Sequence, residues 1–128
     1  MVYIKPDQVE KYLNIIQRMG LDYLSTIRNF VIVRALWQTG MRISELLSVK
    51  KEDIRSDGGV EIIGKGRKRR VVFLTPDIVK SINFYEYLKG ERGVFSEYVF
   101  ISHANNSFGK KLSRCSVEEL FRKINKKL

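Results

Sequence analysis

The sequence predicts an α+β fold that is mainly α-helical, in which the helices pack around a small antiparallel three-stranded sheet. Apolar residues recur at helical spacing in five segments, and β-favouring residues gather in three short runs. The length of 128 residues suits one compact domain with a modest core, and no repeat or linker divides it. We therefore expect a single domain over residues 1–128.

Two helices are expected in the first forty residues. Lys5-Pro6-Asp7 favours a helix start, because proline suits a first helical turn and an acid suits its positive end. Gly20 suits its end. A longer core helix follows from about Asp22 to Gln38, with Trp37 expected inside. The first apolar stripe is Val9, Leu13, Ile16 and Met19, and the second is Leu24, Ile27, Val31 and Ala35.

A short third helix is expected after Thr39-Gly40, running through Ser44 to Val49. The spacing of apolar residues then changes, and residues 60–63 and 71–74 form β-favouring runs that predict two antiparallel strands. A glycine-containing basic loop joins them. A third short strand is expected around residues 98–101.

Two helices complete the pattern. The fourth opens at Thr75-Pro76-Asp77, with Thr75 as its cap and Gly90 near its end. The last follows Ser116, which forms an expected capping box with Glu119. Their buried stripes are expected to be Ile78, Ile82 and Tyr85, and then Val117, Leu120, Phe121 and Ile124.

The charge favours a polyanionic partner. Lysine and arginine total 24 against 14 acids, giving a net charge of +10, which suits nucleic acid, although membrane headgroups or an unused surplus of charge fit as well. No apolar stretch reaches the roughly 20 residues that cross a bilayer. Without a signal peptide pattern and with one cysteine, Cys115, we expect a cytoplasmic protein. One cysteine and one histidine also make a protein-built metal site unexpected.

Arg42 and Glu45 stand one helical turn apart just after Gly40. An arginine held there could offer two donors to one phosphate, with Glu45 fixing its angle. An ordinary exposed Arg–Glu pair fits the same spacing, since such pairs are common and weak.

Residues 65–70 contain five basic residues among six. A β-turn would present them as a cluster that could track a phosphate backbone, and a solvated turn is the alternative. Residues 59–65 imitate a nucleotide-binding phosphate loop, but Gly66 stands where a Mg²⁺-binding Ser or Thr is required. His103, the sole histidine, is surrounded by polar residues and is expected in a polar turn rather than as a base.

Together, residues 39–46 and 62–71 resemble, in order and spacing, the first two landmarks of the tyrosine recombinases, the phage integrase family. Residues 5–9, 100–102 and 112–114 are also similar to parts of that family, so the resemblance covers nearly the whole chain. It implies the amino-terminal part of a DNA breaking-rejoining catalytic domain, with a role in site-specific recombination or DNA integration, as in mobile elements. The implied partner is double-stranded DNA, and no cofactor or metal is implied.

The resemblance also implies residue roles. Arg42 would bind the scissile phosphate, Glu45 would be its acidic companion, and Lys65 would act as general acid toward the departing 5′ oxygen. The other expected DNA contacts are Arg67, Lys68, Arg69, Arg70 and Arg114.

The family pattern then continues with features that this sequence does not match. These are a His-x-Leu-Arg-His-like box with the second arginine, another histidine or tryptophan, and the tyrosine nucleophile. Asn106 stands where such a box around His103 would need arginine, and all six tyrosines lie too early. Without a nucleophile no 3′-phosphotyrosine can form, so we expect this chain alone to be inactive.

Three hypotheses follow. The chain is the amino-terminal part of a recombinase catalytic domain and binds duplex DNA through its phosphates. Alternatively, it is half of a split recombinase, completed by a carboxy-terminal catalytic fragment or working with copies of itself. The third hypothesis is a small basic RNA-binding or adaptor module whose recombinase-like patterns are coincidental.

Overall fold

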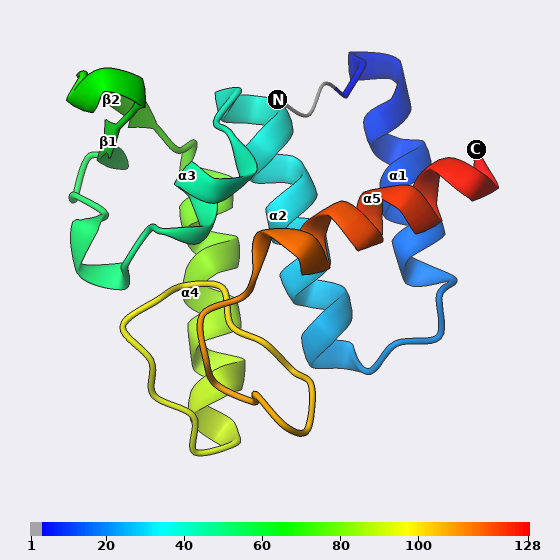
Figure 1. Cartoon of the computed structure of the whole chain (residues 1–128). Coiled ribbons are helices and arrows are strands. Elements are labelled where there is room, and N and C mark those ends of the chain that lie inside the picture. Colours follow the sequence, from blue (N-terminus) through cyan, green and yellow to red (C-terminus); the bar gives the residue numbers. More distant parts are fainter. Residues whose placement is uncertain (1–3) are drawn as a thin grey trace.

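The computed structural model describes residues 4–128. Within them, five α-helices and a two-stranded antiparallel sheet form the fold (Figure 1). The helices are α1 (Val9–Gln17), α2 (Tyr23–Thr39), α3 (Ile43–Leu47), α4 (Pro76–Glu91) and α5 (Arg114–Lys127), and the strands are β1 (Gly59–Ile63) and β2 (Arg69–Phe73). Short 3-10 helices occupy Pro6–Gln8, Lys51–Asp53 and Lys65–Arg67.

The core is built around α2. Helices α1 and α4 pack against it, while α5 crosses α1 and α3 (Figure 1). The hairpin of β1 and β2 lies at the edge of this helical layer, beside α3. The mainly helical α+β class is therefore confirmed, with a core rich in fully buried side chains such as Ile32, Val33, Tyr85, Phe100 and Ile124.

The ends of α2 follow local chemistry. Asp22 caps the first turn, because its Oδ1 accepts a hydrogen bond of 2.8 Å from the backbone N–H of Ser25. Gly40 ends the helix in the left-handed conformation, at φ +69°. The expected burial of Trp37 is wrong, since its side chain is 43% exposed. Ala35 and Leu36 fill the core side of that turn, and the next position around the helix faces outward.

The third expected strand is not formed. Residues 98–101 make only isolated bridges, from Tyr98 to Lys50 and from Ile101 to Lys111. Val99 and Phe100 are adjacent yet both fully buried, so the side chains do not alternate between two faces as they do along a strand. The β-favouring side chains of Val99, Phe100 and Ile101 are buried in the core instead.

A buried lysine holds that segment in place. Lys89 on α4 is 1% exposed, and its ammonium donates to the carbonyl oxygens of Val99 at 2.7 Å and Tyr98 at 3.2 Å. It also forms an ion pair with Glu86. Burial lowers the pKa of Lys89, and the carboxylate of Glu86 opposes that shift. The lysine thus replaces the backbone pairing that a third strand would have given.

Helix α5 begins earlier than expected. Its cap is Ser113, whose Oγ accepts from the backbone N–H of Ser116 at 3.2 Å. The capping box of Ser116 and Glu119 is therefore wrong, and Glu119 pairs with Arg122 instead. The reason is tertiary, because the buried Leu112 fixes the chain one residue before Ser113. Thr75 occupies the cap position of α4, but its side chain accepts no capping hydrogen bond. The buried stripes of both helices are confirmed.

His103 lies between α2 and α4 and joins them. Its Nδ1 is 2.7 Å from Ser25 Oγ and its Nε2 is 2.9 Å from the Tyr85 hydroxyl. Burial, together with the nearby positive charge of Arg28, lowers the pKa of His103 to about 4 from 6.5. The imidazole is therefore neutral in the folded protein at neutral pH.

The low pKa of His103 predicts acid sensitivity. As pH falls from 6.5 toward about 4, the unfolded chain gains a proton on His103 that the folded chain does not, so stability falls over that window. His103→Gln should remove this share of the loss, on the order of 2 kcal/mol. Denaturant unfolding of both proteins at a series of pH values measures it. An unchanged pH dependence in the variant would refute the assignment.

Candidate nucleic-acid interface

Helix α3 presents Arg42 to solvent. The turn at Gly40 ends α2, and the next residue, Met41, is fully buried and anchors the chain. Arg42 is the cap residue of α3, and its backbone N–H donates to Glu45 Oε1 at 2.9 Å. The backbone of Arg42 is thus fixed, and its side chain is exposed.

Glu45 binds the guanidinium of Arg70 and not that of Arg42. Arg70 donates with both terminal nitrogens, at 2.8 Å to Oε1 and 3.1 Å to Oε2. The Glu45 side chain is only 9% exposed. These bonds lower the pKa of Glu45 and raise the pKa of Arg70. This forked pair attaches β2 to α3, while the hydrogen bond between Arg42 and Glu45 is made by the backbone N–H of Arg42.

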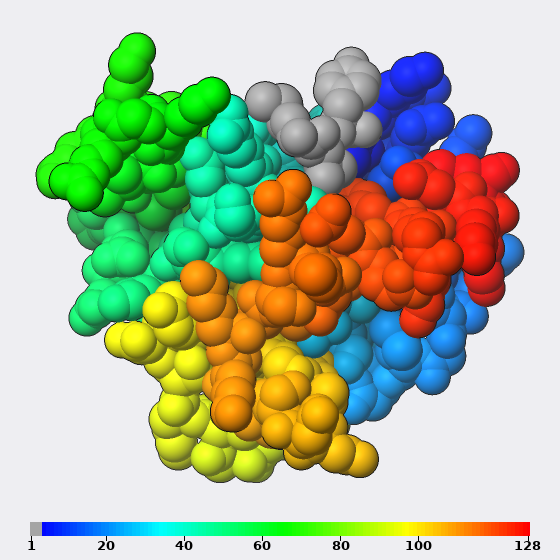
Figure 2. All heavy atoms as spheres, in the orientation of Figure 1, coloured from blue at the N-terminus to red at the C-terminus, as the bar shows by residue number. Residues whose placement is uncertain are grey.

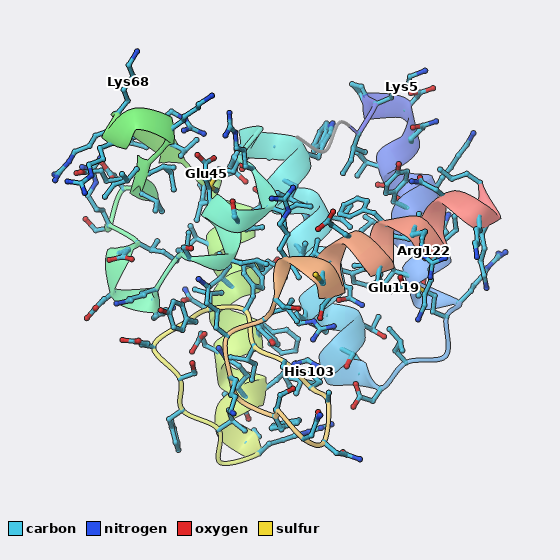
Figure 3. All side chains as sticks on the ribbon, viewed as in Figure 1. Lys5, Glu45, Lys68, His103, Glu119 and Arg122 are labelled. Atoms are coloured by element: carbon cyan, nitrogen blue, oxygen red, sulfur yellow. The ribbon has the colours of Figure 1, made fainter. Side chains whose placement is uncertain are left out.

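The five basic residues of the hairpin divide into two kinds. Arg70 is bound to Glu45, and Arg69 pairs with Glu61 across the sheet at 3.0 Å. Within residues 4–128, the other three have no carboxylate within 4 Å, and all three are exposed: Lys65, Arg67 and Lys68. We call these three residues the hairpin tip. Figure 3 shows Lys68 projecting from it away from the body of the molecule.

A hollow of about 560 Å³ lies between α3 and the exposed face of α5. Arg42 and Arg114, far apart in sequence, both line it, together with Ser44, Glu118 and Arg122. Arg114 pairs with Glu118 at 3.2 Å, whereas no carboxylate of residues 4–128 lies within 4 Å of the Arg42 guanidinium. The structure therefore brings Arg42, the expected phosphate-binding arginine, and Arg114, an expected DNA contact, to one hollow. Lys65 does not line it.

This arrangement suits an anion better than a metal. Guanidinium groups bind phosphate oxygens through paired donors, and three of the side chains that line the hollow carry one, those of Arg42, Arg114 and Arg122. Within the described residues, no cluster of three histidine, cysteine or acidic side chains could hold a metal ion. In the same part of the chain, no helix is long and apolar enough to span a membrane.

Sequence reasoning missed a third basic group. Lys111 donates to Ser48 Oγ at 3.2 Å, and both Lys111 and Lys50 lie over the ring of Tyr98. The only signals in the sequence are two lysine doublets, Lys50-Lys51 and Lys110-Lys111. Doublets are common on solvated surfaces, and only the folded chain brings these two together.

Comparisons with known proteins agree with one another. The family model described as the phage integrase family matches residues 3–128. Tyrosine recombinase XerC of Caldanaerobacter subterraneus is 29% identical over 118 residues, covering 91% of this chain and 30% of that protein. Tyrosine recombinase XerD of Halalkalibacterium halodurans is 32% identical over 126 residues, covering 94% and 39%. The chain thus spans about a third of the length of these relatives.

Solved structures show the same fold. The crystal structure of XerA recombinase superposes with a TM-score of 0.71 at 23% identity, covering 99% of this chain and 43% of that one. XerH site-specific recombinase bound to palindromic difH substrate, in a post-cleavage complex, gives a TM-score of 0.72 at 22% identity. That match covers 96% of this chain and 36% of XerH.

Proposed function

Because this chain belongs to the phage integrase family, we propose that it binds double-stranded DNA and takes part in site-specific recombination or integration. The observation that carries the proposal is the shared hollow of Arg42 and Arg114, with the exposed hairpin tip on the same side of the molecule as α3. Two guanidinium groups and three free cations fit the repeating phosphates of a duplex. The cytoplasm, where such DNA is found, is the proposed location.

Within this proposal Arg42 binds the phosphate to be cut, and Arg114 binds the same phosphate or its neighbour. Glu45 positions Arg42 through the backbone N–H and fixes the hairpin through Arg70. Lys65 stands at the hairpin tip as the proton donor. When a tyrosine oxygen attacks phosphorus and the bond to the 5′ oxygen breaks, the ammonium of Lys65 passes its proton to that oxygen.

The second arginine and the attacking tyrosine of the family pattern have no match in this sequence. The proposal for these residues is therefore limited to phosphate binding and proton donation. Cleavage and religation belong to the complete site of the family, of which Arg42, Glu45 and Lys65 are the proposed half.

Charge removal at the hairpin tip tests the proposal. We expect log affinity for a short duplex to fall linearly with log salt, and Lys65→Gln, Arg67→Gln and Lys68→Gln together to lower the slope by about 2 to 3. Fluorescence anisotropy titrations between about 50 and 200 mM salt measure both quantities. A matched control loses the same charge from α1, the residue that caps its end, and α4, through Lys11→Gln, Arg18→Gln and Lys80→Gln.

The control variant should bind nearly as wild type. Salt-independent binding by wild type, or equal slopes in the two variants, would overturn the proposal. Tighter binding to structured RNA than to duplex DNA at matched salt would instead favour an RNA-binding module.

A further inference from the structure

The third basic group, in addition to the hollow and the hairpin tip, lies near the end of α3 that is farther from Arg42. Two lysines contact the ring of Tyr98, with the Nζ atoms of Lys111 and Lys50 at 5.1 and 5.8 Å from its centroid. Lys111 also donates to Ser48 Oγ at 3.2 Å. We call Lys50, Tyr98 and Lys111 the Tyr98 cluster.

The backbone around this cluster is fixed by pairing between distant segments. Lys50 and Tyr98 face each other in one antiparallel bridge, and Lys111 pairs with Ile101 in another. The N–H of Val99 donates to the carbonyl of Val49 at 3.2 Å. Two lysines from segments about sixty residues apart are thus held over one ring before any ligand binds, which reduces the entropy lost on binding.

The charges of the cluster are incompletely balanced. Lys50 has one carboxylate nearby, Glu97 at 3.6 Å, and that carboxylate is 58% exposed. In the part of the chain that the structure describes, no carboxylate lies within 4 Å of Lys111. An ammonium carries three donors, and one of those of Lys111 is used on Ser48. An anion at this position would relieve the repulsion between the two lysines and accept the remaining donors.

The cluster continues the row of groups that begins at Arg42. Ser44, which lines the hollow of Arg42 and Arg114, lies one helical turn before Ser48, and Ser48 Oγ donates to the Ser44 carbonyl at 2.9 Å. Arg42 and Ser48, the residues that flank α3 at its two ends, are six positions apart, which at the helical rise corresponds to about 9 Å. Lys111 also precedes Arg114 by only three residues. In Figure 2 the orange surface around residues 110–114 lies directly beside the teal surface of α3, on one face of the molecule.

We propose that Lys50 and Lys111, which both contact the ring of Tyr98, bind a second backbone phosphate of the duplex whose first phosphate lies at Arg42 and Arg114. The inference rests on the proposed function and adds a binding site to it. Its ligand is a phosphodiester, recognised by two ammonium groups without base contacts. Such a contact sets the direction in which the duplex leaves the hollow, because two phosphates on one strand define its path across α3.

The test removes both ammonium groups. Lys50→Gln with Lys111→Gln should lower the slope of log affinity against log salt by about 1 to 2, and should weaken duplex binding about tenfold near 100 mM salt. The control, Lys11→Gln with Lys80→Gln, loses the same charge on α1 and α4 and should change the affinity less than threefold. Both variants should keep the melting temperature within a few degrees, because the half-buried Lys50 forms only a long ion pair with an exposed carboxylate, the other lysines are exposed, and such groups contribute little to stability.

The outcomes separate this inference from the proposed function. If wild type binds duplex DNA and the hairpin-tip variant weakens that binding, the proposed function stands. If the Lys50 and Lys111 variant then binds as its control does, the second phosphate site is wrong, although the proposed function is kept. Absence of duplex binding by wild type would overturn both. Tyr98→Leu gives an independent test. It keeps every charge and should still weaken duplex binding, because the two lysines would no longer be held by the ring.

Discussion

Lys89→Met is expected to lower the free energy of unfolding by about 3 to 5 kcal/mol. The ammonium of Lys89 is 1% exposed and binds two backbone carbonyls and the carboxylate of Glu86. Methionine has nearly the same length but no donor. The carbonyls of Tyr98 and Val99 would lose their buried partner, and Glu86 would keep a charge without its counter-ion.

Urea unfolding followed by circular dichroism measures the loss. The double variant Lys89→Met with Glu86→Gln should recover part of it, because the second change removes the uncompensated charge. Lys80→Met, on the exposed part of the same helix, is the control and should change stability by less than about 0.5 kcal/mol. A cost for Lys89→Met as small as that of the control would show that the buried lysine is not needed.

Gly58→Ala is expected to cost about 3 kcal/mol of stability. Gly58 has φ +84°, and a Cβ placed on it would lie 2.5 Å from the backbone oxygen of Leu74. That oxygen belongs to the backbone where β2 ends, and the N–H of Leu74 donates to the Gly58 carbonyl at 2.9 Å. Backbone cannot move aside as a flexible side chain can, so the hairpin would have to separate from the turn that precedes it.

The control for Gly58 isolates the clash from the backbone conformation. Gly93 has a similar φ of +71°, but a Cβ there would meet nothing within 4 Å. Gly93→Ala should therefore cost only about 1 kcal/mol, the strain of alanine in the left-handed region. Thermal or denaturant melts of both variants measure the difference. Equal costs would mean that the Leu74 carbonyl yields and that conformation alone determines the effect.

Local chemistry made much of the fold predictable. Asp22 and Gly40 determine the ends of α2 within a few residues of themselves, and the glycine-containing turn between two β-favouring runs leads directly to the hairpin. The buried apolar residues of α4 and α5 could be predicted from their helical spacing alone. In each of these cases the deciding contacts lie close in sequence.

Other features depended on partners that the sequence does not reveal. Residues 98–101 carry strand-like composition, but a lysine from α4 takes up two of their carbonyls. Ser113 and Ser116 both fit a helix cap, and the burial of Leu112 selects the first. No local rule distinguishes these alternatives.

The candidate site divides in the same way. The spacing of Arg42 and Glu45 could be read directly, and so could the density of charge in the hairpin. The partner of Glu45 could not, because Arg70 lies 25 residues away. The meeting of Arg42 with Arg114, and of Lys50 with Lys111, likewise needed the packing of α3 against α5 and the bridges around Tyr98.

The pair of Glu45 and Arg70 also couples the position of the hairpin to that of the Arg42 backbone. Oε1 of Glu45 accepts from both the Arg42 backbone and the Arg70 guanidinium, so one oxygen atom joins the first turn of α3 to β2. A displacement of the hairpin would therefore move Glu45, and with it the backbone of the residue proposed to bind the phosphate.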